Sequence, residues 1–410
     1  MLKNIIIVND RAYIDGGAGY VAITSAIALA KRRYNVILFS AIGPIDSSLK
    51  ESGVKVICLN QCGILEDRNR LRAIVQGIWN NKAYKELNKT LDKLNKDETI
   101  VHVHAYSKAL SASIFAAVAK SGFKLVVTLH EFFTICPNGG LFNYRLNKIC
   151  HVHPSSFRCY LCNCDSRNYF QKIWRSLRQV VLNKAIAMNY KIHMFTISDL
   201  TEKIFKEKES WISRSKIQLC FTRINNPVNL TNNKIVDISN NDIYVMIARI
   251  SIEKGVDLFC EAITDLGLKG RVLGAGYLLE EYKKKYPKIE FVGWVSGKEK
   301  EKCLSDCKAL ILPSVWYETF GLVVAEMKSM GIPSIVPDKS AAAEQIIDNE
   351  TGFIFNIGNV ESLKKTIIKC ENTNLSIMQE NILKSFDSTS FSCELHTMKL
   401  IDEYNKILSN

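Results

Sequence analysis

The stretch that most constrains the fold runs from Ala309 to Asp338 and reads ALILPSVWYETFGLVVAEMKSMGIPSIVPD. Its apolar start, Ala309–Leu312, predicts a strand that a proline ends, and a loop, Ser314–Thr319, follows. The next residues, Phe320–Met330, predict a helix that stops at a glycine with a proline just beyond. Ile332–Val336 then begins a second apolar strand. Strand, loop, helix and strand in this order form the building block of a parallel sheet.

The loop before this helix is where such folds bind ligands, at the carboxyl ends of the strands. Glu318 in the loop and Glu326 within the helix have seven residues between them. The backbone N–H groups of Phe320, Gly321 and Leu322 would be the unpaired donors of a helix N-terminus, which suits a diphosphate. Glu318 could accept hydrogen bonds from sugar hydroxyls, and ribose hydroxyls would pair Glu326, which is costly to bury alone. The spacing also fits a surface helix with two solvated glutamates.

The amino-acid sequence of this stretch resembles that of the family 4 retaining glycosyltransferases (GT4). Their signature is two glutamates separated by seven residues, around a WYExFG-like core and ahead of an A-x-G-x-P turn. The matching residues are Trp316, Tyr317, Glu318, Phe320, Gly321, Glu326, Gly331 and Pro333, and Ser329 replaces the usual alanine. The resemblance covers nearly the whole chain. It implies an α/β fold of two Rossmann-like, doubly wound domains that face a cleft, known as the glycosyltransferase B (GT-B) architecture.

The length, composition and charge of the chain limit its domain number and its partners. A chain of 410 residues can form two domains with full cores, and its 47% hydrophobic and 23% charged content is that of a soluble globular protein. The net charge of +13 favours nucleic acid, anionic membrane or phosphorylated partners. The chain shows no basic–aromatic RNA motif and no zinc finger with paired histidines, so nucleic acid is not expected as a partner. An anionic membrane and phosphorylated substrates are the partners that we expect instead. With no membrane-length apolar run and no secretory signal, we expect a cytoplasmic protein.

A polar run between Asn225 and Asp242 predicts a linker. We therefore expect an N-terminal, acceptor-binding domain at residues 1–225, with a cysteine-rich insertion at 136–164, and a nucleotide-sugar-binding domain at 226–392. By the resemblance, a C-terminal helix at 393–410 crosses back to the first domain. Apolar runs predict further strands at Asn4–Val8, Val36–Phe39, Val54–Leu59, Thr99–His104, Leu125–Leu129, Phe195–Ser198 and Ile243–Ala248.

Two cations follow the strand Ile243–Ala248. Arg249 and Lys254 suit a diphosphate, because the leaving group gathers negative charge as the glycosidic bond breaks, although such a pair is usually surface charge. The segment resembles the family's GR-x(4)-KG element. By the same resemblance, Gly274 and Gly276 face the nucleotide. Glu344 stands where relatives carry a G-G-x-x-E motif.

The first domain has its own candidates. A glycine cluster that includes Gly17 lies too far past the first strand for a dinucleotide fingerprint. The resemblance nevertheless implies that this cluster faces the cleft. We therefore expect Gly17 to contact the donor. His130, in the segment VTLHEFFTICPNGG, resembles the family histidine that contacts the donor sugar, with Glu131 for the usual aspartate. His102 and His104 lie on one face of a strand, and we expect both to be packing or cleft-edge residues.

Cysteines concentrate in the insertion. Cys159 and Cys162 have the spacing of a chelating pair, and Cys136 and Cys150 could complete a tetrahedral structural zinc site. A subset of the family has a similar insertion. The alternative is a cysteine-rich loop without metal. Since the chain contains no Asp-x-Asp pair, we expect no metal cofactor in catalysis.

The segment Ser166–Lys191 holds six Lys or Arg and no acid, with apolar residues at helical spacing. Such a helix can lie in a membrane interface, or its apolar stripe can pack on the sheet. We expect the former, with apolar residues in the membrane and cations on anionic headgroups. The residues concerned are Phe170, Trp174, Leu177, Arg167, Arg175 and Arg178.

With these features, the resemblance implies a retaining, metal-independent glycosyltransferase. It would move a sugar from a UDP- or GDP-sugar to a hydroxyl of a lipid-linked saccharide acceptor, in cell-surface polysaccharide or lipopolysaccharide synthesis. We expect it at the inner face of the cytoplasmic membrane as a peripheral protein. Two other functions remain open: a sugar-nucleotide epimerase of the same architecture, and a basic scaffold that binds RNA or membrane without catalysis.

Overall fold

The computed structural model describes residues 1–208, 217–228, 230 and 234–409. By their contacts the residues divide into two compact units. The first unit comprises Met1–Gly140, Val152–Pro227 and Thr389–Asn410, and the second comprises Leu141–His151 and Val228–Ser388. Asn229 and residues 231–233, which belong to the expected linker, lie outside the described residues.

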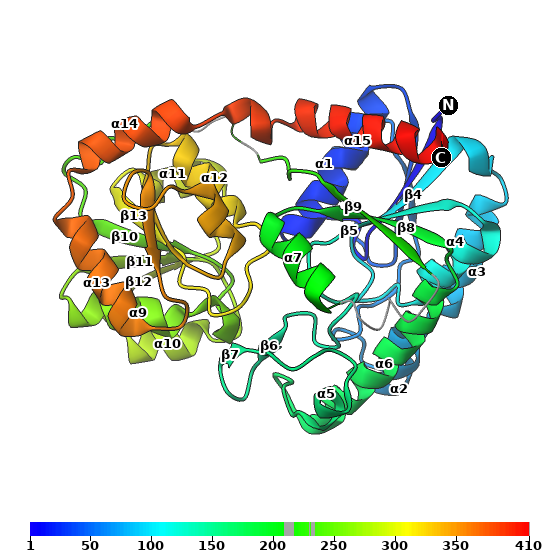
Figure 1. Cartoon of the computed structure of the whole chain (residues 1–410), viewed down its shortest axis with the longest axis horizontal. Helices are drawn as coiled ribbons and strands as arrows, with labels where there is room; N and C mark the ends of the chain where they lie inside the picture. The colour runs from blue at the N-terminus through cyan, green and yellow to red at the C-terminus, as the bar shows by residue number, and fades with distance from the viewer. Residues whose placement is uncertain (209–216, 229, 231–233, 410) are drawn as a thin grey trace. The chain divides into compact units, whose positions relative to one another are not determined.

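The first unit is built on a parallel sheet of seven strands in the order β3-β2-β1-β4-β5-β8-β9 (Figure 1). Most of these strands are almost continuously buried, as is typical of parallel sheets covered on both faces. Their bounds are β1 (Asn4–Val8), β2 (Asn35–Ser40), β3 (Lys55–Cys58), β4 (Thr99–Val103), β5 (Lys124–Thr128), β8 (Lys191–Thr196) and β9 (Gln218–Arg223).

One of the expected strands is displaced. The sequence predicts a strand at Phe195–Ser198, but β8 begins four residues earlier, at Lys191, and ends at Thr196. Lys191 and His193 alternate with apolar residues at the start of β8 and hide its beginning in the sequence. The side chain of Ser198 instead accepts a hydrogen bond from the Thr201 N–H at 3.0 Å, at the start of α7.

Helices cover both faces of this sheet. The C-terminal helix α15 packs on α1, while α3, α4 and α6 pack in succession and α2 contacts α6. The segment 68–96 forms two helices because Asn80 caps a new helix, accepting a hydrogen bond from the Ala83 N–H. The helices are α1 (Gly17–Lys31), α2 (Arg70–Ile78), α3 (Asn81–Leu91), α4 (Ser113–Ser121), α5 (Phe157–Leu161), α6 (Tyr169–Ala187), α7 (Asp199–Lys208) and α15 (Cys393–Ser409).

The second unit is built on a parallel sheet of six strands in the order β12-β11-β10-β13-β14-β15. The strands are β10 (Ile243–Ile247), β11 (Lys269–Leu273), β12 (Glu290–Gly293), β13 (Cys307–Ile311), β14 (Ser334–Pro337) and β15 (Gly352–Phe355). A short antiparallel hairpin of β6 (Phe142–Asn143) and β7 (Lys148–Ile149) groups with this unit.

In this second unit α9 packs on α13, and α12 packs on α14. The helices are α9 (Val256–Asp265), α10 (Leu279–Lys285), α11 (Gly297–Leu304), α12 (Leu322–Ser329), α13 (Val360–Glu371) and α14 (Leu375–Ser385). Short 3₁₀ turns complete the chain: η1 (Ser47–Leu49), η2 (Lys96–Glu98), η3 (Ile252–Lys254), η4 (Ala341–Gln345) and η5 (Ser388–Phe391).

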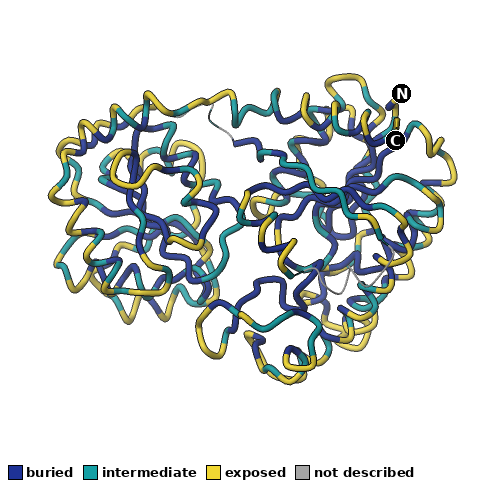
Figure 2. Tube along the Cα trace, in the orientation of Figure 1, coloured by how far each residue is buried: buried dark blue, intermediate teal, exposed yellow. Residues whose placement is uncertain are grey.

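Each unit has its own apolar core around its sheet, and Figure 2 shows both as buried strands inside more exposed helices. No helix in the described part of the chain has the length and apolar character needed to cross a membrane. The chain thus forms two Rossmann-like units, as expected. The strand order reverses between β1 and β4 in the first sheet and between β10 and β13 in the second, and ligands bind at such reversal points.

Candidate functional site

The loops that follow β10 and β13 meet at the carboxyl edge of the second sheet. Gly255 has a φ of +68°, and a Cβ added there would lie 2.0 Å from the carbonyl oxygen of Pro313, so only glycine allows this approach. The contact brings together two residues that the sequence predicted as catalytic. Lys254 Nζ lies 2.8 Å from Oε1 and 2.9 Å from Oε2 of Glu318.

Glu318 is held from several sides. Its Oε2 accepts hydrogen bonds from Ser314 Oγ at 3.0 Å and Trp316 Nε1 at 2.9 Å, and the Lys254 ammonium also lies 4.9 Å from the centre of the Trp316 ring. Burial raises the pKa of the Glu318 carboxyl, but the Lys254 ammonium and the Trp316 and Ser314 donors outweigh it, so the net pKa is lowered. The carboxylate is therefore ionised at neutral pH.

Arg249 lies at the same edge of the sheet. Its Nη2 is 2.7 Å from Oε1 of Glu253, which also accepts from Ser251 Oγ at 2.7 Å. The Glu253 side chain is 4% exposed, whereas that of Arg249 is 62% exposed. The buried carboxylate thus anchors a guanidinium that remains open to solvent.

Glu326 has a partner that the sequence did not reveal. Its Oε2 pairs with Nζ of Lys300 in α11. Lys300 lies in the run KEKEK, which looks like ordinary surface charge, so no sequence signal marked it. Glu344 lies in η4 and is exposed.

Three glycines of this unit occupy positions where a side chain would clash or the backbone has a positive φ. A Cβ at Gly274 would lie 1.9 Å from the carbonyl oxygen of Ala248, and one at Gly276 would lie 2.0 Å from that of Ile250. Both therefore allow the loop after β11 to pack against the loop after β10. Gly321, with a φ of +82°, is the N-cap of α12, which begins at Leu322, two residues later than expected.

Histidines gather at the carboxyl edge of the first sheet. His130 follows β5, and its Nε2 lies 3.0 Å from Nδ1 of His104, which follows β4. His102 lies in the core, 2.6 Å from both Tyr404 Oη and Thr128 Oγ1. Burial lowers the pKa of His130 to about 3 and the pKa values of His102 and His104 well below 6.5, so all three are neutral.

His104 and His130 line a pocket of the first unit. Ala18 and Gly19 also line this pocket, while Gly17 is the exposed first residue of α1. The proposed contacts of Gly17 and His130 with the donor stay predictions.

The cysteine-rich segment has buried polar contacts. Cys136 Sγ donates to Asn138 Oδ1 at 3.1 Å, and Lys172 Nζ donates to Cys159 Sγ at 3.4 Å. Cys164, which the sequence analysis left out, is buried, 3.5 Å from Asn138 Nδ2. Among the described residues, no group of three or more His, Cys, Asp or Glu side chains could hold a metal ion. The four-cysteine zinc site stays a prediction.

Three residues of α6 do not face a membrane as expected, and the prediction for them was wrong. Arg175 Nε lies 2.9 Å from Oδ2 of the buried Asp165, and Arg178 Nη1 donates to the carbonyl oxygen of Ser107 at 2.8 Å. Trp174 Nε1 donates to the carbonyl oxygen of Ile74 in α2 at 3.1 Å. The reason is that these side chains lie on the side of α6 that packs on the unit.

Part of the second unit matches a known protein family. Residues 230–384 match the family model described as glycosyl transferases group 1. The match covers less than half of the chain and shows a similarity of its second unit to this family. The matched residues include the loops that carry Lys254, Glu318 and Glu326, which the sequence resemblance had singled out.

Curated relatives share part of this chain. An uncharacterized 41.2 kDa protein in the cps region of Klebsiella pneumoniae is 22% identical over 274 residues, 65% of this chain and 67% of its own length. The uncharacterized glycosyltransferase MJ1178 of Methanocaldococcus jannaschii is 29% identical over 125 residues, 29% of this chain and 35% of its own length. The chain thus spans about a third of the second relative's length.

Solved structures resemble the whole chain. A glycosyltransferase from Rickettsia africae ESF-5 has a TM-score of 0.67 at 19% identity, covering 100% of this chain and 99% of its own. Anabaena Alr3699/HepE in complex with UDP-glucose has a TM-score of 0.65 at 14% identity, covering 98% and 99%. WaaG, a glycosyltransferase involved in lipopolysaccharide biosynthesis, has a TM-score of 0.63 at 12% identity, covering 96% and 99%. The fold is the GT-B fold of two Rossmann-like domains, as expected.

Proposed function

We propose that the chain transfers a sugar from a nucleotide-diphospho-sugar to a hydroxyl of a lipid-linked saccharide, with retention at the anomeric carbon. The observation that carries this proposal is the Lys254–Glu318 pair at the strand-order reversal of the second sheet, in the part of the chain that matches the group 1 glycosyl transferases, with the Arg249 guanidinium at the same edge. This edge offers cations for a diphosphate and a carboxylate for a sugar.

The cations act on the leaving group. As the glycosidic bond breaks, negative charge develops on the departing nucleoside diphosphate, and fixed cations and N–H groups stabilise that charge. Lys254 is held by Glu318 and the Trp316 ring, so little reorganisation is needed at that moment. Arg249 and the backbone at Phe320, Gly321 and Leu322, at the start of α12, complete the proposed diphosphate contacts.

Glu318 orients the sugar. Its Oε2 accepts from Lys254, Ser314 and Trp316, whereas Oε1 accepts from Lys254 alone among the described residues. A carboxylate oxygen has two lone pairs, so Oε1 retains a position for a sugar hydroxyl. Glu326, whose Oε2 holds Lys300, uses its other oxygen for the ribose in the same way.

The comparisons support parts of this proposal. A solved neighbour holds UDP-glucose, which supports a uridine nucleotide, and a GDP-sugar is the other donor to test. A relative from a cps region and a neighbour from lipopolysaccharide biosynthesis support a saccharide acceptor in cell-surface polysaccharide or lipopolysaccharide synthesis. The epimerase alternative is not favoured, because the family model describes glycosyl transferases. Because the chain has no Asp-x-Asp pair, the proposed reaction needs no metal ion.

A thermal shift series tests the donor site. UDP, GDP and ADP are added to the whole chain in the presence of a chelator, and UDP or GDP should raise the melting temperature. The Lys254→Ala variant should lose the shift, whereas Lys298→Ala, a change at an exposed lysine, should keep it. If no nucleotide shifts the wild type, or if both variants respond equally, the proposed donor site is wrong.

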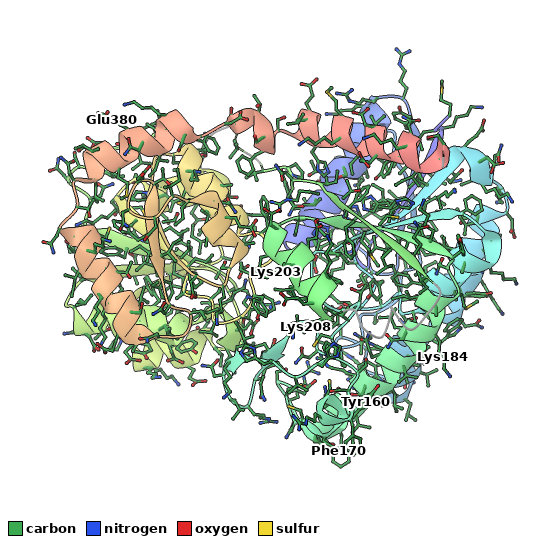
Figure 3. The ribbon with its side chains drawn as sticks, in the orientation of Figure 1. Tyr160, Phe170, Lys184, Lys203, Lys208 and Glu380 are labelled. Atoms are coloured by element: carbon green, nitrogen blue, oxygen red, sulfur yellow. The ribbon has the colours of Figure 1, made fainter. Side chains whose placement is uncertain are left out.

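We also propose a peripheral position on the inner face of the cytoplasmic membrane, carried by an apolar face on three helices. Helix α6 contacts both α2 and α5, and each of the three exposes large apolar side chains. Phe170, 81% exposed, points out from the end of α6 (Figure 3). The apolar face consists of Leu71, Ile74, Val75, Phe157, Leu161, Phe170, Ile173 and Leu177.

Cations accompany this apolar face. Arg158 lies on α5, Arg167 just precedes α6 and Lys184 lies on it, and all three are exposed. Each cation near an anionic surface contributes about 1 kcal/mol, and a buried phenylalanine or leucine side chain about 2 kcal/mol. Apolar and charged contacts together therefore favour an anionic membrane as the occupant.

Vesicle co-sedimentation tests the membrane proposal. Binding should require anionic lipid, weaken as salt rises and be lost in the double variant Phe170→Asp, Leu177→Asp. The control Ile377→Asp changes an exposed apolar residue of the second unit and should leave binding intact. Sedimentation of the double variant at the wild-type level would show that the apolar face is not the membrane contact.

A further inference from the structure

Lys300 and Glu326 join two helices that begin at the same edge of the second sheet. Lys300 is the fourth residue of α11, which follows β12, and Glu326 is the fifth residue of α12, which follows the loop after β13. In a parallel sheet the carboxyl ends of the strands lie at one edge, where doubly wound domains bind ligands. The Lys300 ammonium pairs with Oε2 of Glu326, and the two side chains are each 26% exposed.

Contacts within each helix do not explain this pair. Side chains three and four positions apart on a helix are neighbours. No acid stands at those positions around Lys300, and no cation stands at them around Glu326. Each charge therefore finds its partner on the other helix.

The stability of the fold gives little reason for the pair either. A partly exposed ion pair contributes little to folding. A cation near the start of a helix is also unfavourable, because the helix N-terminus carries a partial positive charge. Lys298 and Lys302 of the same helix are exposed, whereas Lys300 is half-buried beside Glu326. Contact with a ligand is the other reason for a cation to be held at this place.

Both partners keep open positions for hydrogen bonds. Among the described residues, Oε1 of Glu326 accepts from no donor, and the Lys300 ammonium donates only to Oε2 of Glu326. An ammonium has three N–H donors, and a carboxylate oxygen has two lone pairs. The pair therefore offers a donor beside an acceptor. Because Lys300 already holds the Glu326 carboxylate in place, less side-chain freedom is lost when a ligand binds.

Two adjacent hydroxyls match this donor and acceptor. One hydroxyl can donate to Oε1 of Glu326 while its neighbour accepts from Lys300. A ribose carries such a pair of hydroxyls at its 2′ and 3′ positions, and it is uncharged, as the ion pair is in sum. Glu326 lies about 6 Å along α12 from Leu322, where the diphosphate contacts are proposed. In a nucleoside diphosphate the ribose is the group next to the diphosphate.

We infer that Lys300 is a ribose-binding residue of the donor site. It fixes the Glu326 carboxylate and donates a hydrogen bond to one ribose hydroxyl, while Oε1 of Glu326 accepts from the other. The inference rests on the proposed function, which places the ribose at Glu326. It adds a contact through which the site selects ribonucleotides over their deoxy forms.

Calorimetric titration of the whole chain tests this contact. The ligands are UDP or GDP, whichever binds the wild type more tightly, and its 2′-deoxy and 3′-deoxy forms. Each deoxy form should bind the wild type about tenfold more weakly, which is the effect of one lost hydrogen bond.

The variant Lys300→Met keeps a long apolar side chain and removes the ammonium. It should bind the parent nucleotide about tenfold more weakly than the wild type does. One of the two deoxy penalties should also disappear, because the hydroxyl that accepts from Lys300 has lost its partner. A residue that only stabilises the fold would not change this discrimination between nucleotides.

Lys302→Met is the matched control on the same helix. Because Lys302 is exposed, this change should leave the affinities and both deoxy penalties at the wild-type level. Lys300→Met should also melt close to the wild type, since a partly exposed ion pair contributes little to stability.

The other outcomes overturn the inference in distinguishable ways. If Lys300→Met binds every nucleotide as Lys302→Met does, the pair is only a surface contact. If both deoxy penalties persist in Lys300→Met while the parent nucleotide binds more weakly, Lys300 contacts a phosphate instead. If the wild type binds the deoxy forms as well as the parent, the ribose contact is wrong and the proposed transfer stands. If neither UDP nor GDP binds the wild type, both proposals fail.

Discussion

Lys254 and Glu318 depend on each other at the level of single side chains. Both are largely shielded from solvent, at 15% and 16% exposed, so removing one leaves a partly desolvated charge. We predict that Lys254→Ala and Glu318→Gln each lower the free energy of unfolding by about 1–3 kcal/mol. The double variant should lose less than the sum of the two. Urea denaturation measures this, and strict additivity would show that the pair is not formed in solution.

His396 gives the first unit a titratable contact in its core. Its Nε2 lies 2.9 Å from Ser25 Oγ and its Nδ1 lies 2.8 Å from the carbonyl oxygen of Asn225. Burial lowers the pKa of His396 to about 4, although the bond to Asn225 opposes this change, and the nearby Lys399 lowers it further. The unfolded chain, with a pKa near 6.5, therefore binds a proton before the folded chain does.

Stability should consequently fall on acidification. Between about pH 6.5 and pH 4 the unfolded state binds more protons at His396, which alone lowers the free energy of unfolding by on the order of 1.4 kcal/mol per pH unit. The other buried histidines, whose pKa values are also lowered, add to this decrease. His396→Gln should flatten this part of the profile. Urea midpoints from pH 7 to pH 4 provide the measurement, and identical profiles for wild type and variant would contradict the assignment.

At the scale of elements, the loop after β11 packs on the loop after β10 only because Gly274 lacks a side chain. A Cβ at this position, where φ is +148°, would lie 1.9 Å from the carbonyl oxygen of Ala248. Gly297 also has a positive φ, +55°, but nothing lies within 4 Å of an added Cβ. Gly274→Ala should therefore destabilise the second unit by several times the ~1 kcal/mol expected for Gly297→Ala.

Melting and nucleotide binding of the two alanine variants check this comparison. Gly274→Ala should also weaken UDP or GDP binding, because the loop lies at the edge that carries the proposed donor site. Equal melting temperatures for the two variants would mean that the loop relaxes without loss.

The cysteine-rich segment holds a buried lysine. Lys172 is 1% exposed, and its Nζ donates to Cys159 Sγ at 3.4 Å. Burial alone would lower the pKa of Lys172, but negative charge on Cys164, Cys159 and Cys136 outweighs it and raises the pKa. A structural zinc in this segment would bind cysteines as thiolates.

Metal analysis of protein purified without added zinc tests the proposed site at Cys136, Cys150, Cys159 and Cys162. About one equivalent per chain is expected, falling in Cys159→Ser and unchanged in the control Cys303→Ser. Substoichiometric zinc, with a melting temperature unaltered by chelator, would identify a cysteine-rich segment without metal.

How far the sequence predicted these elements depended on local signals. Buried apolar strands such as Asn4–Val8 were predictable because each is bounded by turns, whereas β8 was displaced because Lys191 interrupts its apolar start. In α6 the sequence could not separate inward from outward cations, because Arg178 pairs with the distant carbonyl oxygen of Ser107. Lys300 was missed for the same reason, since its partner Glu326 lies in another helix.

At the scale of the whole molecule, each unit has a group of polar residues at the reversal point of its own sheet. The first unit has a pocket lined by residues with unpaired buried polar atoms, and the second has the cations and carboxylates of the proposed donor site. The sequence motifs singled out Lys254 and Glu318, which the structure pairs, because these residues lie in one stretch and one neighbouring loop. The pocket was mostly invisible, because Asn9, Tyr106 and Thr134 follow three different strands and carry no motif.

The most direct test of the account is turnover of a nucleotide sugar. The whole chain is incubated with UDP- and GDP-sugars and a lipid extract, and the released nucleoside diphosphate and the labelled lipid are measured. We predict release that depends on the extract, with retention in the product, and a loss on the order of a hundredfold or more in Lys254→Ala and in Glu318→Gln. Lys298→Ala should match the wild type. Near wild-type turnover in Lys254→Ala or Glu318→Gln, or no labelled lipid with any donor, would contradict the account.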